Sequence, residues 1–180
     1  MNLQTLNKLT IAVVVITLMY SCSITKNTSS KVAKVNITST KTELPGQGSV
    51  IFTQKKDRVE MSLELNFPLK ANKTVAVHIH EHGDCGNAGN DAHGHWNPSK
   101  NAHGKWDSAQ FHLGDIGNIQ LDASGKGIFK ITTDKWSIGT GGINDIVGKG
   151  LIVHDGVDDY TTQPTGNAGS RIGCGVITIF

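Results

Sequence analysis

The sequence of 180 residues predicts an all-β fold, an eight-stranded β-sandwich or barrel with two long functional loops. Three observations support this class. Short apolar segments alternate with a period of two, as expected for strands with one buried face. Glycine, which ends strands and forms turns, is abundant at 21 residues, whereas proline is scarce at 4. No long stretch has the 3.6-residue period of an amphipathic helix.

The predicted strands follow one another with glycine-rich turns between them. They cover residues 32–38, 49–53, 59–67, 75–80, 117–121, 127–133, 148–154 and 173–179. The third shows the clearest alternation, because every second residue from Val59 to Phe67 is apolar. Residues 82–111 and 155–172 are too long and too rich in glycine for hairpin turns. Long loops within a compact domain usually serve function.

The start of the chain is predicted to be an export signal. Lys8 precedes an apolar run of twelve residues, 9–20, which is too short to span a bilayer comfortably and suits the core of a signal peptide. The run ends in Met19-Tyr20-Ser21-Cys22, which resembles a bacterial lipobox, in which a small residue precedes a cysteine that receives lipid. Two alternatives stay open: a retained membrane anchor, and cleavage by an ordinary signal peptidase near Ser21.

These features divide the chain into three parts. Residues 1–22 form the signal peptide of lipoprotein type, residues 23–31 a polar flexible tether, and residues 32–180 the folded domain. The domain is therefore expected in the periplasm or cell envelope, anchored to the membrane by lipid at Cys22.

The three cysteines agree with export. An odd cysteine in an exported protein needs an explanation, and lipid on Cys22 provides one. Cys85 and Cys174 then remain as a pair, and disulfides persist outside the cytoplasm.

The charge balance excludes one class of partner. Without Lys8, the remaining chain has 16 basic and 15 acidic residues. Nucleic-acid binding needs a basic patch that displaces counterions, so general nucleic-acid binding is not expected. Attraction for a small anion must be local.

Histidine gives the strongest chemical signal. Seven histidines fall within 35 residues and an eighth ends a distant apolar strand; they are His78, His80, His82, His93, His95, His103, His112 and His154. Two residues apart on a strand, His78 and His80 point to one face. His154 can complete a site from a neighbouring strand, and imidazole suits copper and zinc. A second set, His103, His112 and Asp115, needs one more ligand to close a tetrahedron around zinc. His95 lies between the sets and could serve either.

Five segments, in order, resemble the copper–zinc superoxide dismutase family of the bacterial exported type. They are His78-Ile79-His80-Glu81-His82-Gly83-Asp84-Cys85, Gly94-His95-Trp96-Asn97-Pro98, His103 with His112-Leu113-Gly114-Asp115, Val153-His154-Asp155 with Asp158-Asp159, and Gly166-Asn167-Ala168-Gly169-Ser170-Arg171 with Cys174-Gly175. The resemblance covers essentially the whole domain.

The resemblance implies a fold, an activity and two metals. The fold is a Greek-key β-sandwich, and the activity is dismutation of superoxide to oxygen and hydrogen peroxide by a one-electron copper cycle. It implies copper ligands His78, His80, His95 and His154, and zinc ligands His95, His103, His112 and Asp115. His95 would bridge both metals and donate a proton, Arg171 would attract and position superoxide, and Asp158 would orient ligand histidines of both sites.

Some residues depart from the family pattern. Val75-Ala76-Val77 and residues 69–73 are atypical but remove no ligand. His82 and His93 match no family ligand and are interpreted as exposed loop histidines, with an extra metal site as the alternative.

Two other classes of function are alternatives to the enzyme. One is a non-catalytic exported copper- or zinc-binding module, and the other is a structural or interaction protein on the same sandwich. A carrier has little need of a bridging geometry together with Arg171, so the enzyme is favoured. The family includes monomers and dimers, so a homodimer is one expectation and a monomer the other.

Overall fold

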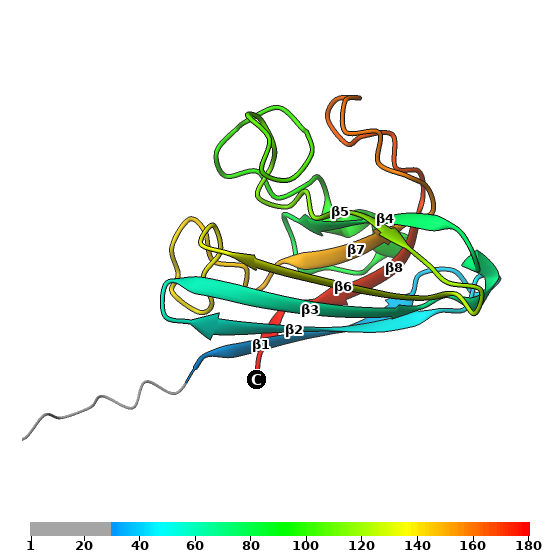
Figure 1. Cartoon of the computed structure of the whole chain (residues 1–180), viewed down its shortest axis with the longest axis horizontal. Coiled ribbons are helices and arrows are strands. Elements are labelled where there is room, and N and C mark those ends of the chain that lie inside the picture. Colours follow the sequence, from blue (N-terminus) through cyan, green and yellow to red (C-terminus); the bar gives the residue numbers. More distant parts are fainter. Residues whose placement is uncertain (1–29) are drawn as a thin grey trace, which may run out of the picture.

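The computed structural model describes residues 30–180, which form a single antiparallel sheet curled into a nearly closed barrel (Figure 1). The predicted signal peptide, Cys22 and most of the predicted tether lie outside the described residues. Among residues 30–180, no helix is long and apolar enough to cross a membrane.

The described part of the chain contains nine strands and two short 3-10 helices. The strands are β1 (Val32–Ser39), β2 (Gln47–Lys55), β3 (Arg58–Asn66), β4 (Thr74–His80), β5 (Gly117–Gln120), β6 (Lys126–Thr133), β7 (Gly150–His154), β8 (Arg171–Val176) and β9 (Thr178–Ile179). The helices are η1 (Pro68–Lys70) and η2 (Asn87–Ala92). The predicted all-β class is confirmed.

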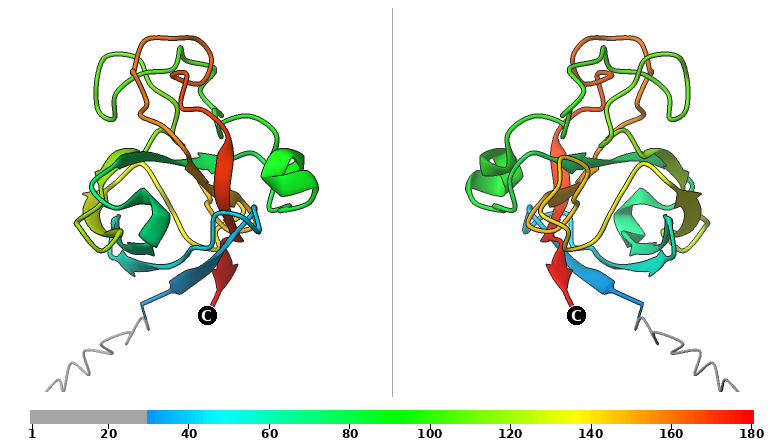
Figure 2. Two further views of the ribbon diagram at one scale, coloured as in Figure 1. Left: turned by 90° about the vertical axis from the view of Figure 1, so that its right-hand side faces the viewer. Right: turned by 90° about the vertical axis from the view of Figure 1, so that its left-hand side faces the viewer.

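The strand order is that of a Greek key. Along the sheet the order is β5-β4-β7-β8-β1-β2-β3-β6, and β9 pairs with β1. The chain therefore crosses over when β3 pairs with β6 and when β4 pairs with β7. The two ends of this order, β5 and β6, follow each other in sequence, so the barrel nearly closes when it is seen end-on (Figure 2).

The core fills the barrel with one face of each strand. In β3 the predicted alternation holds: Val59, Met61, Leu63 and Leu65 are buried, and the residues between them are exposed or half-buried. Burying each such side chain contributes roughly 1.5–3 kcal/mol. This packing makes the barrel a rigid support for the loops.

The structure differs from the predicted strands at one end. The predicted strand 173–179 is divided at Ile177, which is buried and exchanges backbone hydrogen bonds with the segment before β7: its N–H donates to Lys149 O, and its carbonyl accepts from Gly148 N. Residues 134–149 form a third long connection, in addition to the two expected from the sequence. Trp136 anchors it by packing edge-on against Phe52 with ring centroids 5.9 Å apart.

The two predicted long loops leave the barrel on the same side (Figures 1 and 2). They comprise residues 81–116, between β4 and β5, and residues 155–170, between β7 and β8. They contact each other where His103 N donates to Gln163 Oε1 at 2.8 Å and Gln163 Nε2 donates to His103 O at 2.9 Å. The loops together cover the outer face of β4 and β7.

Candidate metal centre

Strand β4 supplies the first two functional side chains. Val77 and Ile79 point into the barrel core, so the period of two places His78 and His80 on the opposite face. That face would be exposed in a bare barrel, but both histidines are buried because the long loops lie over it. The strand and the loops thus bury imidazole rings whose nitrogens cannot form hydrogen bonds to solvent.

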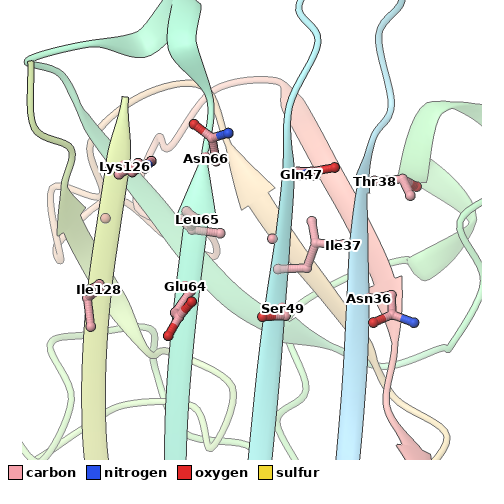
Figure 3. Close-up of a pocket in the computed structure, with 12 residues that line it drawn as sticks. Asn36, Ile37, Thr38, Gln47, Ser49, Glu64, Leu65, Asn66, Lys126 and Ile128 are labelled. Atoms are coloured by element: carbon pink, nitrogen blue, oxygen red, sulfur yellow. The ribbon is translucent and has the colours of Figure 1, made fainter. Parts of the chain in front are cut away.

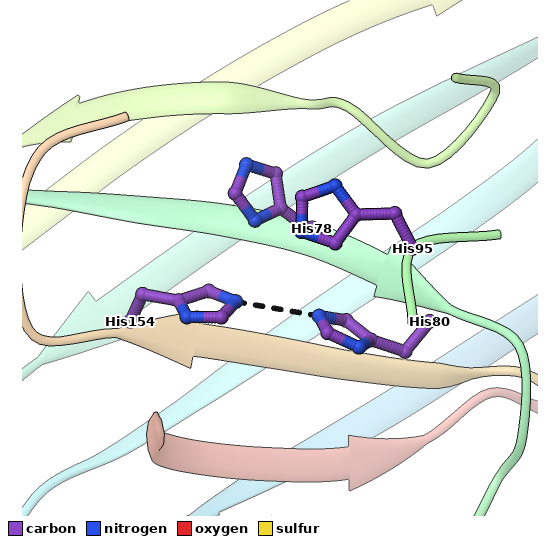
Figure 4. A group of neighbouring side chains, drawn as sticks. All are labelled: His78, His80, His95 and His154. Carbon is purple, nitrogen blue, oxygen red and sulfur yellow. Dashed lines mark hydrogen bonds between the residues drawn. The ribbon is translucent and has the colours of Figure 1, made fainter. Parts of the chain in front are cut away.

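Four histidines converge on this face. Side-chain nitrogens of His78, His80, His95 and His154 lie within 4.8 Å of one another (Figure 4). His95 reaches the group from the long loop, which pairs with the end of β4 through the bridge between His80 and His95. His154 ends β7, the neighbour of β4 in the sheet.

Hydrogen bonds define the tautomers of two of these rings. Nδ1 of His80 lies 2.9 Å from His93 O, and Nδ1 of His154 lies 3.2 Å from Gly169 O. A carbonyl only accepts, so each Nδ1 carries the hydrogen and each Nε2 has a free lone pair. These two Nε2 atoms face each other at 3.3 Å. Two lone pairs at this distance repel unless a cation lies between them.

Burial keeps these rings neutral. Desolvation, followed by the neighbouring histidines, holds the pKa of His80 and of His154 well below its usual range. Desolvation likewise lowers the pKa of His95 to about 4, although Asp115 opposes the shift. Neutral imidazole is the form that binds metal.

Asp158 fixes a third ring and connects it to the second group. Its Oδ2 accepts from His78 Nε2 at 2.8 Å, and its Oδ1 accepts from His103 Nε2 at 2.9 Å. The Nδ1 atoms of both histidines are therefore directed inward. Gly166, at φ +65°, lies so close that an added Cβ would clash with Asp158 and His103.

The second group combines three histidines and one carboxylate. Ligand atoms of His95, His103, His112 and Asp115 lie within 4.8 Å of one another, and all four residues are buried. The carboxylate lies 2.8 Å from His95 Nδ1, 3.0 Å from His103 Nδ1 and 3.2 Å from His112 Nδ1. Backbone N–H groups of Gly104 and His112 donate to its Oδ2 at 3.1 and 2.8 Å.

This group is strongly coupled electrostatically. Burial would raise the pKa of Asp115, but the three imidazoles around its carboxylate, His103 foremost, hold it well below its usual range. Burial would lower the pKa of His103, but Asp115 and Asp158 raise it to about 9. A positive charge is therefore favoured between these carboxylates.

Ring nitrogens without hydrogen-bond partners indicate whether the two groups can bind metal ions. The buried atoms His78 Nδ1, His95 Nε2, His103 Nδ1 and His112 Nδ1 have no hydrogen-bond partner. The last two lie 3.0 and 3.2 Å from oxygens of Asp115 without forming a hydrogen bond to it. An unsatisfied buried polar atom costs about 1–3 kcal/mol, so four of them in two clusters need a common explanation. Cations preferring imidazole satisfy all four, and the residues therefore fit copper and zinc.

Arg171 lies at the edge of the first group. It begins β8 and pairs with His154 beyond a shift in register between Val153 and His154. Its guanidinium donates to the carbonyls of Gly89 and His93, both in the long loop. Unlike the buried histidines, Arg171 is only partly buried.

The predicted disulfide is confirmed. Cys85 and Cys174 are bonded, with their Cα atoms 5.7 Å apart. The bond joins the long loop to β8, and its sulfur atoms pack with Ala92 and Ile152 in a small second core. This ties the carbonyls that hold Arg171 to the strand from which Arg171 projects.

The hollow shown in Figure 3 is separate from these groups. It crosses β1, β2, β3 and β6, and its lining includes Ile37, Gly48, Leu65 and Lys126 but no histidine. The unpaired buried nitrogens all lie in the histidine groups, so the chemistry is assigned to those groups.

Comparison with known proteins gives the family. The family model described as copper/zinc superoxide dismutase (SODC) matches residues 46–177. The chain belongs to the copper/zinc superoxide dismutase family. The predicted activity, dismutation of superoxide, and the predicted cofactors, copper and zinc, are confirmed.

Individual relatives agree with this membership. The chain is 35% identical over 175 residues to a Cu-Zn superoxide dismutase of Paramecium bursaria Chlorella virus 1, covering 93% of this chain and 92% of the relative. It is 38% identical over 141 residues to an extracellular Cu-Zn superoxide dismutase of Drosophila melanogaster, covering 74% and 76%. Among solved structures, a double mutant of a SOD-like protein from Bacillus subtilis superposes with a TM-score of 0.71 at 29% identity, covering 81% of this chain and 96% of that chain.

The structure also shows functional groups that the sequence did not indicate. The backbone carbonyls of Gly89, His93 and Gly169 orient Arg171, His80 and His154. Every residue has a carbonyl, so only the loop conformation shows which ones serve the site.

Proposed function

We propose that this dismutase holds copper through His78, His80, His95 and His154, and zinc through His95, His103, His112 and Asp115. The observation that carries the assignment is the direction of the free ring nitrogens. In the first group, hydrogen bonds on the opposite nitrogen leave His80 Nε2, His154 Nε2 and His78 Nδ1 directed inward. In the second group, three Nδ1 atoms surround one carboxylate.

The metals divide the chemistry between them. Copper, when bound, supplies the one-electron chemistry by which two superoxide ions and two protons give oxygen and hydrogen peroxide, whereas zinc has no redox chemistry in proteins. The four-ligand set that contains a carboxylate suits a closed zinc site.

His95 is the one residue common to both groups. Its Nδ1 faces Asp115 at 2.8 Å, and its buried Nε2 faces the first group without a hydrogen-bond partner. Nε2 is thus placed to take up a proton beside the substrate and to give it to the product peroxide. The second group holds the ring in position through this exchange.

Arg171 positions the anion. Its two bonds to loop carbonyls fix the guanidinium, and its partial exposure lets a small anion reach it. Arginine is always charged and offers a planar fork of donors, so it both attracts and orients superoxide.

Replacement of His95 tests the assignment. His95→Ala removes a ligand from both groups, and we expect loss of most activity and a changed copper spectrum. His112→Ala, which removes a ligand from the second group alone, should lower zinc content more than copper content. An active His95→Ala enzyme with an unaltered copper spectrum would refute the shared-ligand role.

We further propose that residues 1–22 direct export and that lipid on Cys22 anchors the domain, residues 32–180, to the cell envelope through the tether 23–31. The apolar run before Cys22 and the disulfide between Cys85 and Cys174 support this location. An extracellular relative is consistent with it. Cys22→Ser should move the protein from the membrane to the soluble fraction. A wild-type protein that is already soluble, with unmodified Cys22, would contradict the anchor.

A further inference from the structure

Three exposed side chains beside the first histidine group belong to neither metal group described above. They are Glu81, His82 and His93, whose ligand atoms lie within 4.8 Å of one another. We propose that they form a third metal site, for a divalent ion that prefers imidazole, of the Zn²⁺ or Cu²⁺ class.

The backbone brings these donors together. Residues 80–82 and 92–95 run antiparallel, because Glu81 N donates to Gly94 O at 3.0 Å and His82 N donates to Ala92 O at 3.2 Å. The two segments extend the bridge between His80 and His95. The donors therefore lie on a supported ribbon rather than on a free loop tip, as a site of defined geometry requires.

The three side chains are free to bind an ion. The rings of His82 and His93 lie edge to face, with centroids 4.5 Å apart and planes at 81°. Within residues 30–180, Glu81 and His93 enter hydrogen bonds only through their backbones, and no hydrogen bond or ion pair engages the ring of His82. No competing interaction has to be broken before a metal binds.

His93 has a backbone conformation that favours glycine. Its φ is 60° and its ψ is −138°, and a residue with a Cβ is strained there. A glycine would meet the backbone requirement without strain, yet the chain has a histidine. A histidine at a strained position, beside two other donors, is consistent with use of its side chain.

The ligand set suits a zinc-like ion. Two imidazoles and one carboxylate match the three protein ligands of open zinc sites, in which water fills the fourth position. All three residues are exposed, so the ion would exchange with solvent. Bound metal would join residues 81–82 to His93, whose carbonyl accepts from His80 and Arg171.

Metal stoichiometry of the holoenzyme tests the proposal. The enzyme, with copper and zinc already bound, is dialysed to equilibrium against Zn²⁺, and metals per chain are counted by mass spectrometry. We expect one copper and two zinc ions in the wild type. His82→Gln and Glu81→Gln should each weaken the additional zinc at least about tenfold, the lower end of the loss seen when even supporting residues are removed. His93→Gly should do the same while it keeps the carbonyl and suits the positive φ.

A matched control distinguishes binding at this site from non-specific binding of zinc by exposed carboxylates. Asp91 is an exposed carboxylate of the same loop outside the group, so Asp91→Asn should keep the additional zinc. Unchanged copper and retention of the first zinc in each variant show that the described metal centre is intact. The proposal is overturned if the wild type binds only one zinc, or if His82→Gln and His93→Gly retain the additional zinc at undiminished affinity.

Discussion

His78 and His103, which belong to different histidine groups, share one carboxylate. Asp158 accepts from His78 Nε2 at 2.8 Å and from His103 Nε2 at 2.9 Å. The same side chain therefore fixes the tautomer of one ring in each group. Loss of this carboxylate should disturb both metals, although Asp158 belongs to neither set of proposed ligands.

Asp158→Asn tests this coupling. The amide loses the negative charge that both rings share and can accept from only one of them through its oxygen, so we expect affinity for copper and for zinc to fall by about 10–100-fold each. Competition with chelators of known affinity measures both. Asp159→Asn is the matched control, because the exposed Asp159 contacts Thr161 and Thr162 of the same loop and no histidine. Unaltered affinity for both metals in Asp158→Asn would show that the shared carboxylate is unimportant.

Substitutions at Arg171 test substrate attraction. The chain is nearly neutral, with a net charge of +2, so its total charge cannot draw in an anion and the local guanidinium must. We expect the rate per copper to decrease in the order Arg171, Arg171→Lys, Arg171→Ile, Arg171→Glu. Pulse radiolysis measures this rate.

Salt dependence gives an internal check on the same residue. The Debye length is only about 8 Å at physiological ionic strength, so salt should slow the wild type more than Arg171→Ile. Arg58, an exposed arginine in β3, is the control, and Arg58→Ile should behave as the wild type. Equal rates for wild type and Arg171→Ile across a salt series would remove Arg171 from the reaction.

The disulfide should stabilise the domain. Cys85 and Cys174 are 89 residues apart in sequence, and closing so long a loop restricts the unfolded chain. The chain-entropy model gives roughly 4–5 kcal/mol as an upper value. Cys85→Ser with Cys174→Ser should lower the free energy of unfolding, measured by denaturant titration, and the reduced wild type should match the double variant. Equal stability of the oxidised wild type and the double variant would contradict this role.

The metal-free protein should be most stable near pH 6.5. The buried histidines His80, His95 and His154 have lowered pKa values in the folded protein. Below about pH 6.5 the unfolded chain therefore binds more protons than the folded protein, and the free energy of unfolding decreases as the pH is lowered. The pKa of His103 is raised to about 9, so the stabilisation that protonated His103 gives to the folded protein is lost as pH rises from 6.5 through 9. Denaturant midpoints of the chelator-treated protein between pH 4.5 and 9.5 measure this. A midpoint that rises steadily on acidification to pH 5 would show that the histidines are not held neutral.

The sequence predicts the histidines of the two groups better than it predicts the backbone groups that orient them. Spacing of two on a strand places His78 and His80 on one face whatever the surrounding loops do. The carbonyls of His93 and Gly169, which define the tautomers of His80 and His154, have no sequence signal because they depend on loop conformation. The division of the last predicted strand at Ile177 arises from a distant partner, Lys149. Local pattern cannot reveal such long-range pairing.

Anomalous diffraction from the metal-loaded enzyme tests the central claim most directly. Data collected at the copper and zinc absorption edges locate each metal independently of any activity. We predict a copper peak bound by His78, His80, His95 and His154, and a zinc peak bound by His95, His103, His112 and Asp115, with His95 contacting both. A copper peak within the second group, or a His95 that contacts only one metal, would contradict the assignment.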